Sequence, residues 1–118
     1  DILGSLEYAC KVSGSKLILV LGHEYCGAIK SAVDKVEMGN ITSLLEKIQP
    51  AVNACRDFDG DKTSANPAYL QHVCAENVKV SVQNIRTKSS ILNQMEVDGD
   101  IKIVGAVYDM ETGMVDFK

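Results

Sequence analysis

The chain has 118 residues, of which 46% are hydrophobic and 24% are charged, with 12 lysines and arginines against 16 aspartates and glutamates. This length suits one domain, and apolar residues along the whole chain exclude a disordered protein. The longest uninterrupted apolar run, Leu17 to Leu21, is too short to cross a membrane. The net charge of −4, the absence of tryptophan and the lack of a basic stripe argue against nucleic-acid binding.

The four cysteines indicate the compartment. The chain opens without a basic segment followed by an apolar one, so we expect a reduced protein of the cytoplasm and not a disulfide-linked secreted one. Each thiol is then either a small core residue or a metal or redox ligand, and its neighbours decide between these roles. The cysteines are Cys10, Cys26, Cys55 and Cys74.

The first third of the chain predicts a helix, a strand and a second helix. Asp1 can cap a helix with apolar residues at spacings of three and four, and Gly14 can end it. The run 17–21 has no polar–apolar alternation, which predicts a strand covered on both faces in a parallel sheet. Helical periodicity resumes over residues 27–36.

The middle of the chain is predicted to be helical. Ser43 and Glu46 form a capping box before an apolar stripe that ends at Cys55, and Pro50 should divide or kink that helix. After a loop at residues 57–64, Asn66–Pro67 predicts the start of a long helix. The apolar stripe of this helix is Leu70, Cys74, Val78, Val82 and Ile85.

The last third predicts a short helix that ends at Gly99, a strand over 101–108 and a terminal strand around Val115 and Phe117. The fold class is therefore α/β, with a mostly parallel sheet flanked by helices. Two main strands and a hairpin partner are too few to cover four or five helices. We therefore expect residues 1–118 to form a single, incomplete domain whose other strands come from another chain or from a longer domain.

The segment Gly22-His23-Glu24-Tyr25-Cys26-Gly27 is the candidate site, because open α/β sheets bind ligands at the carboxyl ends of their strands. The spacing of His23 and Cys26 lets an imidazole nitrogen and a thiolate converge on one metal ion, as in zinc sites. A helix start at Cys26 would favour the thiolate. Tetrahedral zinc needs four donors, so the others must come from elsewhere. In the alternative reading, His23 caps the strand and Cys26 is a small buried residue.

At these residues the sequence resembles the β-class carbonic anhydrases. The similarity runs through Ser5–Ala9 and Lys16–Ala28, continues at 76–78 and 83–85 in the long helix, and reaches 105–109 and 112–113. Cys10 and Ser13 depart from the family, which usually has aliphatic residues there. A larger departure is that family members carry a Cys-x-Asp-x-Arg motif and two parallel strands upstream of the position of Asp1.

The resemblance implies a zinc enzyme that interconverts carbon dioxide and bicarbonate, with His23 and Cys26 as zinc ligands. Gly27 is the candidate substrate-binding residue, and the catalytic Asp/Arg pair is expected upstream of this chain. The family also implies a homo-oligomer. We expect the truncated chain alone to bind zinc weakly and to be inactive. Two alternatives are a hydrolase of carbon disulfide or carbonyl sulfide on the same fold, and a metal-free binding or regulatory remnant.

Other candidate groups have simpler explanations. His72 and Cys74 lie about 200° apart around a helix, so they cannot share a metal ion. The aspartates at 57, 59 and 61 alternate as in a calcium loop, but Ala68 stands where that loop needs its bidentate glutamate. Tyr25 and Tyr108 lie near the site as wall or packing residues, and Glu24 is either a solvated carboxylate or a proton shuttle.

Overall fold

The computed structural model describes all residues from Asp1 to Lys118. Strands β1 (Leu17–His23), β2 (Lys102–Tyr108) and β3 (Val115–Phe117) form one sheet in that order. β1 and β2 are parallel, with Leu17 opposite Lys102 and His23 opposite Tyr108, whereas β3 is antiparallel to β2. The helical segments are α1 (Ile2–Glu7), the π-helix η1 (Tyr8–Val12), α2 (Gly27–Val33), α3 (Gly39–Glu46), α4 (Gln49–Ala54), α5 (Pro67–Lys88) and α6 (Ser90–Val97).

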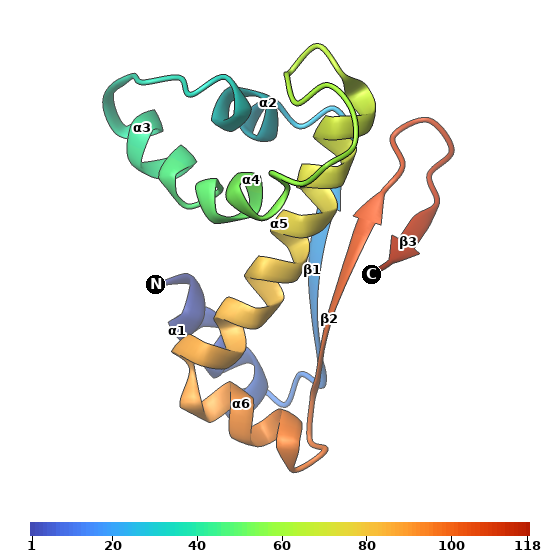
Figure 1. Ribbon diagram of the computed structural model, residues 1–118. Helices are drawn as coiled ribbons and strands as arrows, with labels where there is room; N and C mark the ends of the chain where they lie inside the picture. Colours follow the sequence, from blue (N-terminus) through green and yellow to red (C-terminus); the bar gives the residue numbers. More distant parts are fainter.

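The long helix α5 is the axis of the molecule (Figure 1). It runs beside β1 and β2, with α2, α3 and α4 at the end where these strands finish and α1 and α6 at the opposite end. This α/β arrangement confirms the fold class predicted from the sequence. No helix is both long enough and apolar enough to span a membrane.

Two glycines let α5 approach the sheet closely. A Cβ added to Gly105 in β2 would lie 2.5 Å from Val78 Cγ1, and one added to Gly22 in β1 would lie 2.8 Å from Val78 Cγ2. Real Cβ atoms do not come so near, and the valine side chain has little freedom to move away. Glycine at both positions therefore sets the distance between the helix and the two strands.

The core has two parts, one at each end of α5. The lower cluster joins α5 and α6 to both strands and to the π-helix, and its members are Cys10, Ile18, Val82, Ile85, Leu92, Ile101 and Ile103. The upper cluster joins α5 to α2 and α4, and its members are Ile29, Ala51, Cys55, Tyr69, Val73 and Cys74. Burial of Cys10 and Cys55 confirms that these two thiols are core residues.

Several boundaries match the sequence prediction. The side chain of Asn66 accepts a hydrogen bond from the Ala68 N–H at 3.2 Å, so it caps α5 as expected, with Pro67 in the first turn. α3 ends at Glu46 and α4 begins at Gln49, next to Pro50. Gly99 follows α6 with a φ of 82°, in the left-handed conformation that ends helices.

The predicted capping box of Ser43 and Glu46 is wrong. α3 already begins at Gly39, and the Met38 N–H donates to Thr42 Oγ1 at 2.7 Å. Ser43 lies inside the helix, where its hydroxyl donates to the Asn40 carbonyl at 3.1 Å. A serine followed three residues later by glutamate also occurs within helices, and local hydrogen bonding to the preceding turn satisfies such a serine.

Four further details differ from the prediction. The side chain of Asp1 makes no capping hydrogen bond, and the first helix continues as a π-helix. α2 ends at Val33, three residues before the end of the apolar pattern. On α5, Leu70 is only half-buried, whereas Tyr69 and Val73, which face α4, are fully buried. A helix with neighbours on two sides buries a wider stripe than the one predicted.

Within this chain β1 is covered on one face only, as expected of a sheet whose other strands come from elsewhere. Ile18, Val20 and Gly22 face α5, but Leu17, Leu19 and Leu21 on the other face are 56%, 42% and 49% exposed. The sheet order leaves the outer edge of β1 without a partner strand. The leucine-rich sequence of β1 therefore makes both faces of the strand apolar, and these 118 residues cover only one of them.

Replacement of Gly105 by alanine tests the close approach of α5. The added methyl group overlaps Val78, so we expect Gly105→Ala to lower the free energy of unfolding by about 1–3 kcal/mol. Gly4→Ala is the matched control, because nothing lies within 4 Å of a Cβ at that helical position. Urea unfolding measures both variants, and equal stability of Gly105→Ala and the unmodified chain would contradict the packing described above.

Candidate functional site

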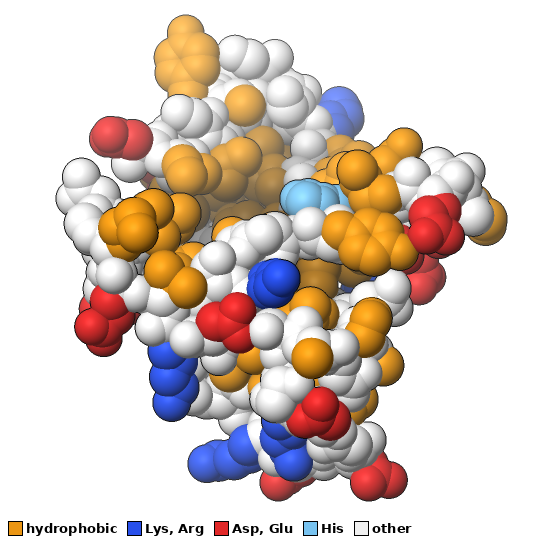
Figure 2. Space-filling model, turned by 90° about the horizontal axis from the view of Figure 1, so that it is seen from above, with side chains coloured by type: hydrophobic (Ala, Val, Ile, Leu, Met, Phe, Trp, Pro, Cys, Tyr) orange, Lys and Arg blue, Asp and Glu red, His pale blue; other side chains and the backbone are white.

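The structure places His23 and Cys26, the predicted site residues, at the same cavity. His23 is the last residue of β1, Cys26 is the residue before α2, and both line one cavity of about 340 Å³. Figure 2 views the end of the molecule where β1 and β2 finish and shows hydrophobic side chains around a hollow with a histidine beside it. The other lining residues are Glu24, Tyr25, Gly27, Ile29, Lys30, Ser64, Pro67, Leu70, Gln71 and Cys74.

The ring of His23 is oriented by the main chain. Its Nδ1 lies 2.7 Å from the carbonyl oxygen of Glu24. A carbonyl oxygen only accepts hydrogen bonds, so Nδ1 carries the proton in the neutral ring and Nε2 keeps a free lone pair. This is the arrangement in which histidines bind metal ions, with one nitrogen held by a backbone carbonyl and the other free.

Cys74 also belongs to this cavity, which the sequence reading missed. Its thiol donates to the carbonyl oxygen of His23 at 3.5 Å, and its Sγ would lie 3.1 Å from a Cβ on Gly22. The pKa of Cys74 is raised, mainly by burial and to a lesser extent by the nearby charge of Cys26, so the neutral thiol is favoured. The signal was present in the sequence, because Cys74 lies on the stripe of α5 that faces the end of β1.

The loop between the two predicted ligands is linked to the turn after β2. The Tyr25 hydroxyl donates to Glu111 Oε1 at 2.8 Å, and the Glu24 N–H donates to the carbonyl oxygen of Tyr108 at 3.2 Å. The pKa of Glu24 is raised, mainly by desolvation and to a lesser extent by repulsion from Asp109 and Glu111. Tyr25 therefore forms part of the cavity wall, whereas Tyr108 contributes to the loop through its backbone.

The donors in this chain fit a zinc ion as two of its four ligands. An imidazole with a free Nε2 and a cysteine at its side form the N and S donor set of zinc sites. The chain holds no cluster of three or more histidines, cysteines or acidic residues that could bind a metal ion. Neither Arg56 nor Arg86 lines the cavity. A complete site with an Asp/Arg pair therefore requires groups other than these residues.

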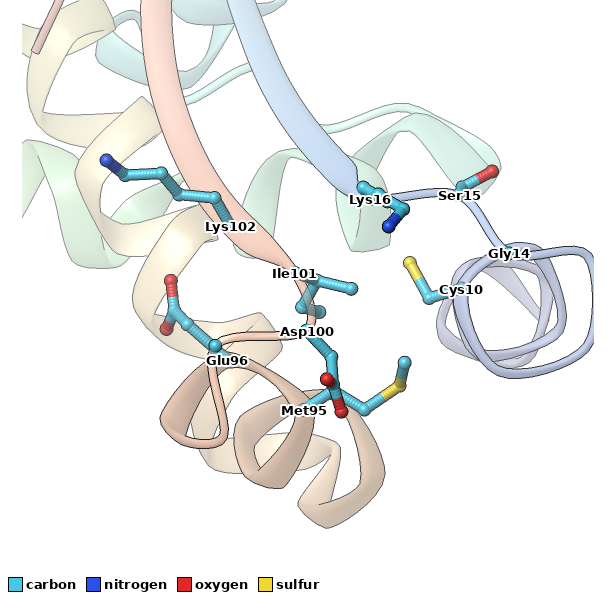
Figure 3. A pocket seen from close by; sticks show the side chains of 10 residues that line it. Cys10, Gly14, Ser15, Lys16, Met95, Glu96, Asp100, Ile101 and Lys102 are labelled. Carbon is cyan, nitrogen blue, oxygen red and sulfur yellow. The ribbon is translucent and has the colours of Figure 1, made fainter.

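A larger surface cavity, of about 690 Å³, lies at the opposite end of the sheet (Figure 3). It opens between the π-helix, the turn at residues 14–16, the end of α6 and the start of β2. Glu96 in its wall already accepts hydrogen bonds from Arg86 Nε at 2.7 Å and from the Ile103 N–H at 3.0 Å. Size alone favours this cavity, but its lining has no histidine and no group of three or more cysteine or acidic side chains that could hold a metal ion, so we place the site at His23 and Cys26.

The other candidate groups are structural. The ring of His72 packs against Phe58, with 5.2 Å between ring centroids, and it does not line the cavity. In the aspartate-rich loop, Asp61 Oδ2 accepts a hydrogen bond from the Thr63 hydroxyl at 2.9 Å. The structure thus gives both groups packing or loop contacts, as predicted.

The tautomer of His23 can be measured directly. We expect long-range ¹H–¹⁵N NMR spectra at a pH above the histidine pKa to show a protonated Nδ1 and a free Nε2, because of the contact with the Glu24 carbonyl. His72, the only other histidine, is the internal comparison. A His23 ring protonated on Nε2 would contradict the proposed orientation of its lone pair.

Comparison with known proteins identifies the family. The family model described as carbonic anhydrase matches residues 1–115. The carbonic anhydrase of Mycolicibacterium smegmatis is 29% identical over 122 residues, which cover 99% of this chain and 56% of that protein. The chain spans about half the length of the curated relatives that it matches.

Solved structures agree on the fold. The β-carbonic anhydrase CafA of Aspergillus fumigatus superimposes with a TM-score of 0.82 at 19% identity, over 100% of this chain and 56% of that one. One of two tetrameric β-carbonic anhydrases from Sordaria macrospora gives a TM-score of 0.83 at 17% identity, over 99% of this chain and 60% of that one. The chain therefore belongs to the carbonic anhydrase family and has the β-class fold.

Proposed function

We propose that this chain serves the zinc-dependent, reversible hydration of carbon dioxide to bicarbonate, and that it supplies His23 and Cys26 as two of the zinc ligands. Alone, the 118 residues bind zinc weakly and do not catalyse the reaction. Membership of the carbonic anhydrase family supports the reaction. The inactivity of the isolated chain is supported by its lack of any group of three or more side chains that could hold a metal ion.

The observation that carries the proposal is the shared cavity of His23 and Cys26 at the carboxyl end of β1. The Glu24 carbonyl holds His23 Nδ1, so that Nε2 is the nitrogen left for the metal. When bound, zinc supplies Lewis acidity, which lowers the pKa of a bound water to about 7. The half-buried Leu70 and the buried Ile29 give the cavity an apolar wall that suits carbon dioxide.

Glu24 is the carboxylate that can exchange protons at this site. It is the only acidic residue in the cavity lining, and Gln71 Nε2 lies 3.4 Å from its Oε1. We propose that Glu24 carries protons between the cavity and solvent, and that Gly27, in the same lining, leaves room for the substrate.

Two forms of the protein test the proposal. In the protein as its gene encodes it, we expect zinc-dependent hydration of carbon dioxide in stopped-flow assays, reduced at least about 100-fold by His23→Ala or Cys26→Ser because each removes a ligand. In the 118-residue chain we expect no rate above buffer. Its zinc affinity should fall well short of the apparent 10–16 kcal/mol of complete structural sites.

His72→Ala is the matched control, since it removes the other histidine of the chain and should leave activity and zinc binding unchanged. Absence of hydration in the gene-encoded protein would favour the metal-free binding or regulatory remnant. Tight zinc binding at one ion per 118-residue chain, with hydration above buffer, would contradict the two-ligand site.

We also propose that the chain forms homo-oligomers through its uncovered sheet face. Leu17, Leu19 and Leu21 of β1 are exposed on this face, Leu19 lies beside the half-buried Val104 of β2, and Phe117 of β3 is exposed as well. The face is therefore apolar across all three strands, and it continues to the unpaired edge of β1. Exposed apolar faces and free strand edges favour association.

Light scattering after gel filtration tests this association. We expect a mass above that of one chain, and a shift towards the monomer in Leu19→Lys, because the new charge has to be desolvated in the contact. Leu44→Lys is the control, since Leu44 is a similarly exposed leucine on α3, away from the sheet. A monomer at all concentrations, or an equal effect of both variants, would contradict the proposed face.

The cytoplasmic location expected from the cysteines remains a prediction. All four thiols are free in the structure, and this supports a reducing compartment.

A further inference from the structure

The loop between His23 and Cys26 turns through a residue in an unfavourable backbone conformation. Tyr25 has a φ of 54°, in the left-handed region that glycine and asparagine adopt most readily. Its side chain is 71% exposed, so burial of the ring does not hold it there. Besides the backbone bond from Glu24 to the Tyr108 carbonyl, a contact of the Tyr25 side chain is therefore needed to stabilise this conformation in the folded chain.

The contact is a hydrogen bond to the turn between β2 and β3. The Tyr25 hydroxyl donates to Glu111 Oε1 at 2.8 Å, across 86 positions of sequence. A carboxylate is a strong acceptor for a phenol, and such charge-assisted bonds are stronger than bonds between neutral groups. The bond joins the tip of the loop to a part of the chain that is far away in sequence.

Glu111 is itself held in place. Asp109 Oδ1 accepts hydrogen bonds from the N–H groups of Glu111 at 2.8 Å and Thr112 at 3.0 Å. The Asp109 N–H in turn donates to the carbonyl oxygen of Met114 at 2.8 Å, which closes the turn before β3. The bonds from Thr112 and Glu111 lower the pKa of Asp109, so it is an ionised acceptor at neutral pH.

We propose that the Tyr25–Glu111 hydrogen bond positions the two metal-binding side chains, by holding Tyr25 in the left-handed conformation. A change of φ at Tyr25 rotates the chain that follows, and therefore moves Cys26 relative to His23. With the bond in place, both side chains line the same cavity before any ion arrives. The positioning of donors for a metal rests on the proposed function, whereas the effect on the backbone does not. Tyr25 is thus a positioning residue and not a ligand.

The test uses Tyr25→Phe, Glu111→Gln and the double variant of the 118-residue chain, with Tyr8→Phe as control because Tyr8 is also an exposed tyrosine. The first measurement is the φ of residue 25 in the metal-free chain, from NMR couplings and backbone chemical shifts. We expect a positive φ in the unmodified chain and in Tyr8→Phe. We expect averaging towards negative φ in both single variants, because the left-handed conformation then loses its tether.

The second measurement is a titration with Co²⁺, followed by the thiolate-to-cobalt charge-transfer band. We expect affinity about three- to tenfold weaker in each single variant and no further loss in the double variant, as for two partners of one contact. Tyr25→Asn should bind Co²⁺ more tightly than Tyr25→Phe, because asparagine tolerates the left-handed conformation without the tether. A role only in overall stability would not produce this difference.

The outcomes separate the two proposals. A positive φ that persists in Tyr25→Phe and Glu111→Gln, with unchanged Co²⁺ affinity, overturns the positioning role. Equal losses in Tyr8→Phe overturn it as well. If the unmodified chain gives no charge-transfer band even in a large excess of Co²⁺, the metal site of the proposed function fails, and the φ measurement still decides whether the hydrogen bond holds the loop.

Discussion

The close contact of α5 with β1 and β2 is the constraint on which the site depends. Val78 fits against the backbone of both strands because Gly22 and Gly105 carry no side chain there. One residue beyond Gly22, the strand ends at His23, whose carbonyl oxygen accepts the thiol hydrogen bond of Cys74 from the same helix. The helix that forms the core thus also forms the floor of the cavity. Packing and site geometry are consequences of one contact.

Much of this arrangement could be predicted from the sequence, because the signals are local. Asn66–Pro67 caps and begins α5, the break at Pro50 separates α3 from α4, and the turn around Cys26 leads from a strand into a helix. The prediction failed where the outcome depends on neighbours. A leucine run does not tell which chain covers each face of β1, and the pattern around Ser43 fits the interior of a helix as well as its start. Cys74 stands on the predicted apolar stripe of α5, but its contact with His23 depends on how α5 packs on β1.

In the site, too, some features follow from neighbouring residues in the sequence, and others depend on contacts between distant residues. The spacing of His23 and Cys26 predicts that they meet, and they line one cavity. The conformation that brings them there involves Tyr25 and Glu111, which no short motif connects. The chain has its two proposed metal donors at one end of the sheet and an uncovered apolar face beside them, and it spans about half the length of its curated relatives. Both features agree with a role as one part of a larger metal site.

The central claim is that these residues supply one nitrogen and one sulfur ligand to a single metal ion. X-ray absorption at the zinc edge, with protein in excess over zinc, measures this set directly, because Zn–S distances of about 2.3 Å are resolved from Zn–N distances of about 2.0–2.1 Å. We expect one sulfur and one imidazole from the protein, with light atoms from solvent in the remaining positions. Two sulfur ligands that fall to one in Cys74→Ser would mean that Cys74 joins the site, and a zinc ion without sulfur would mean that Cys26 is not a ligand; either result would contradict the proposed ligand set.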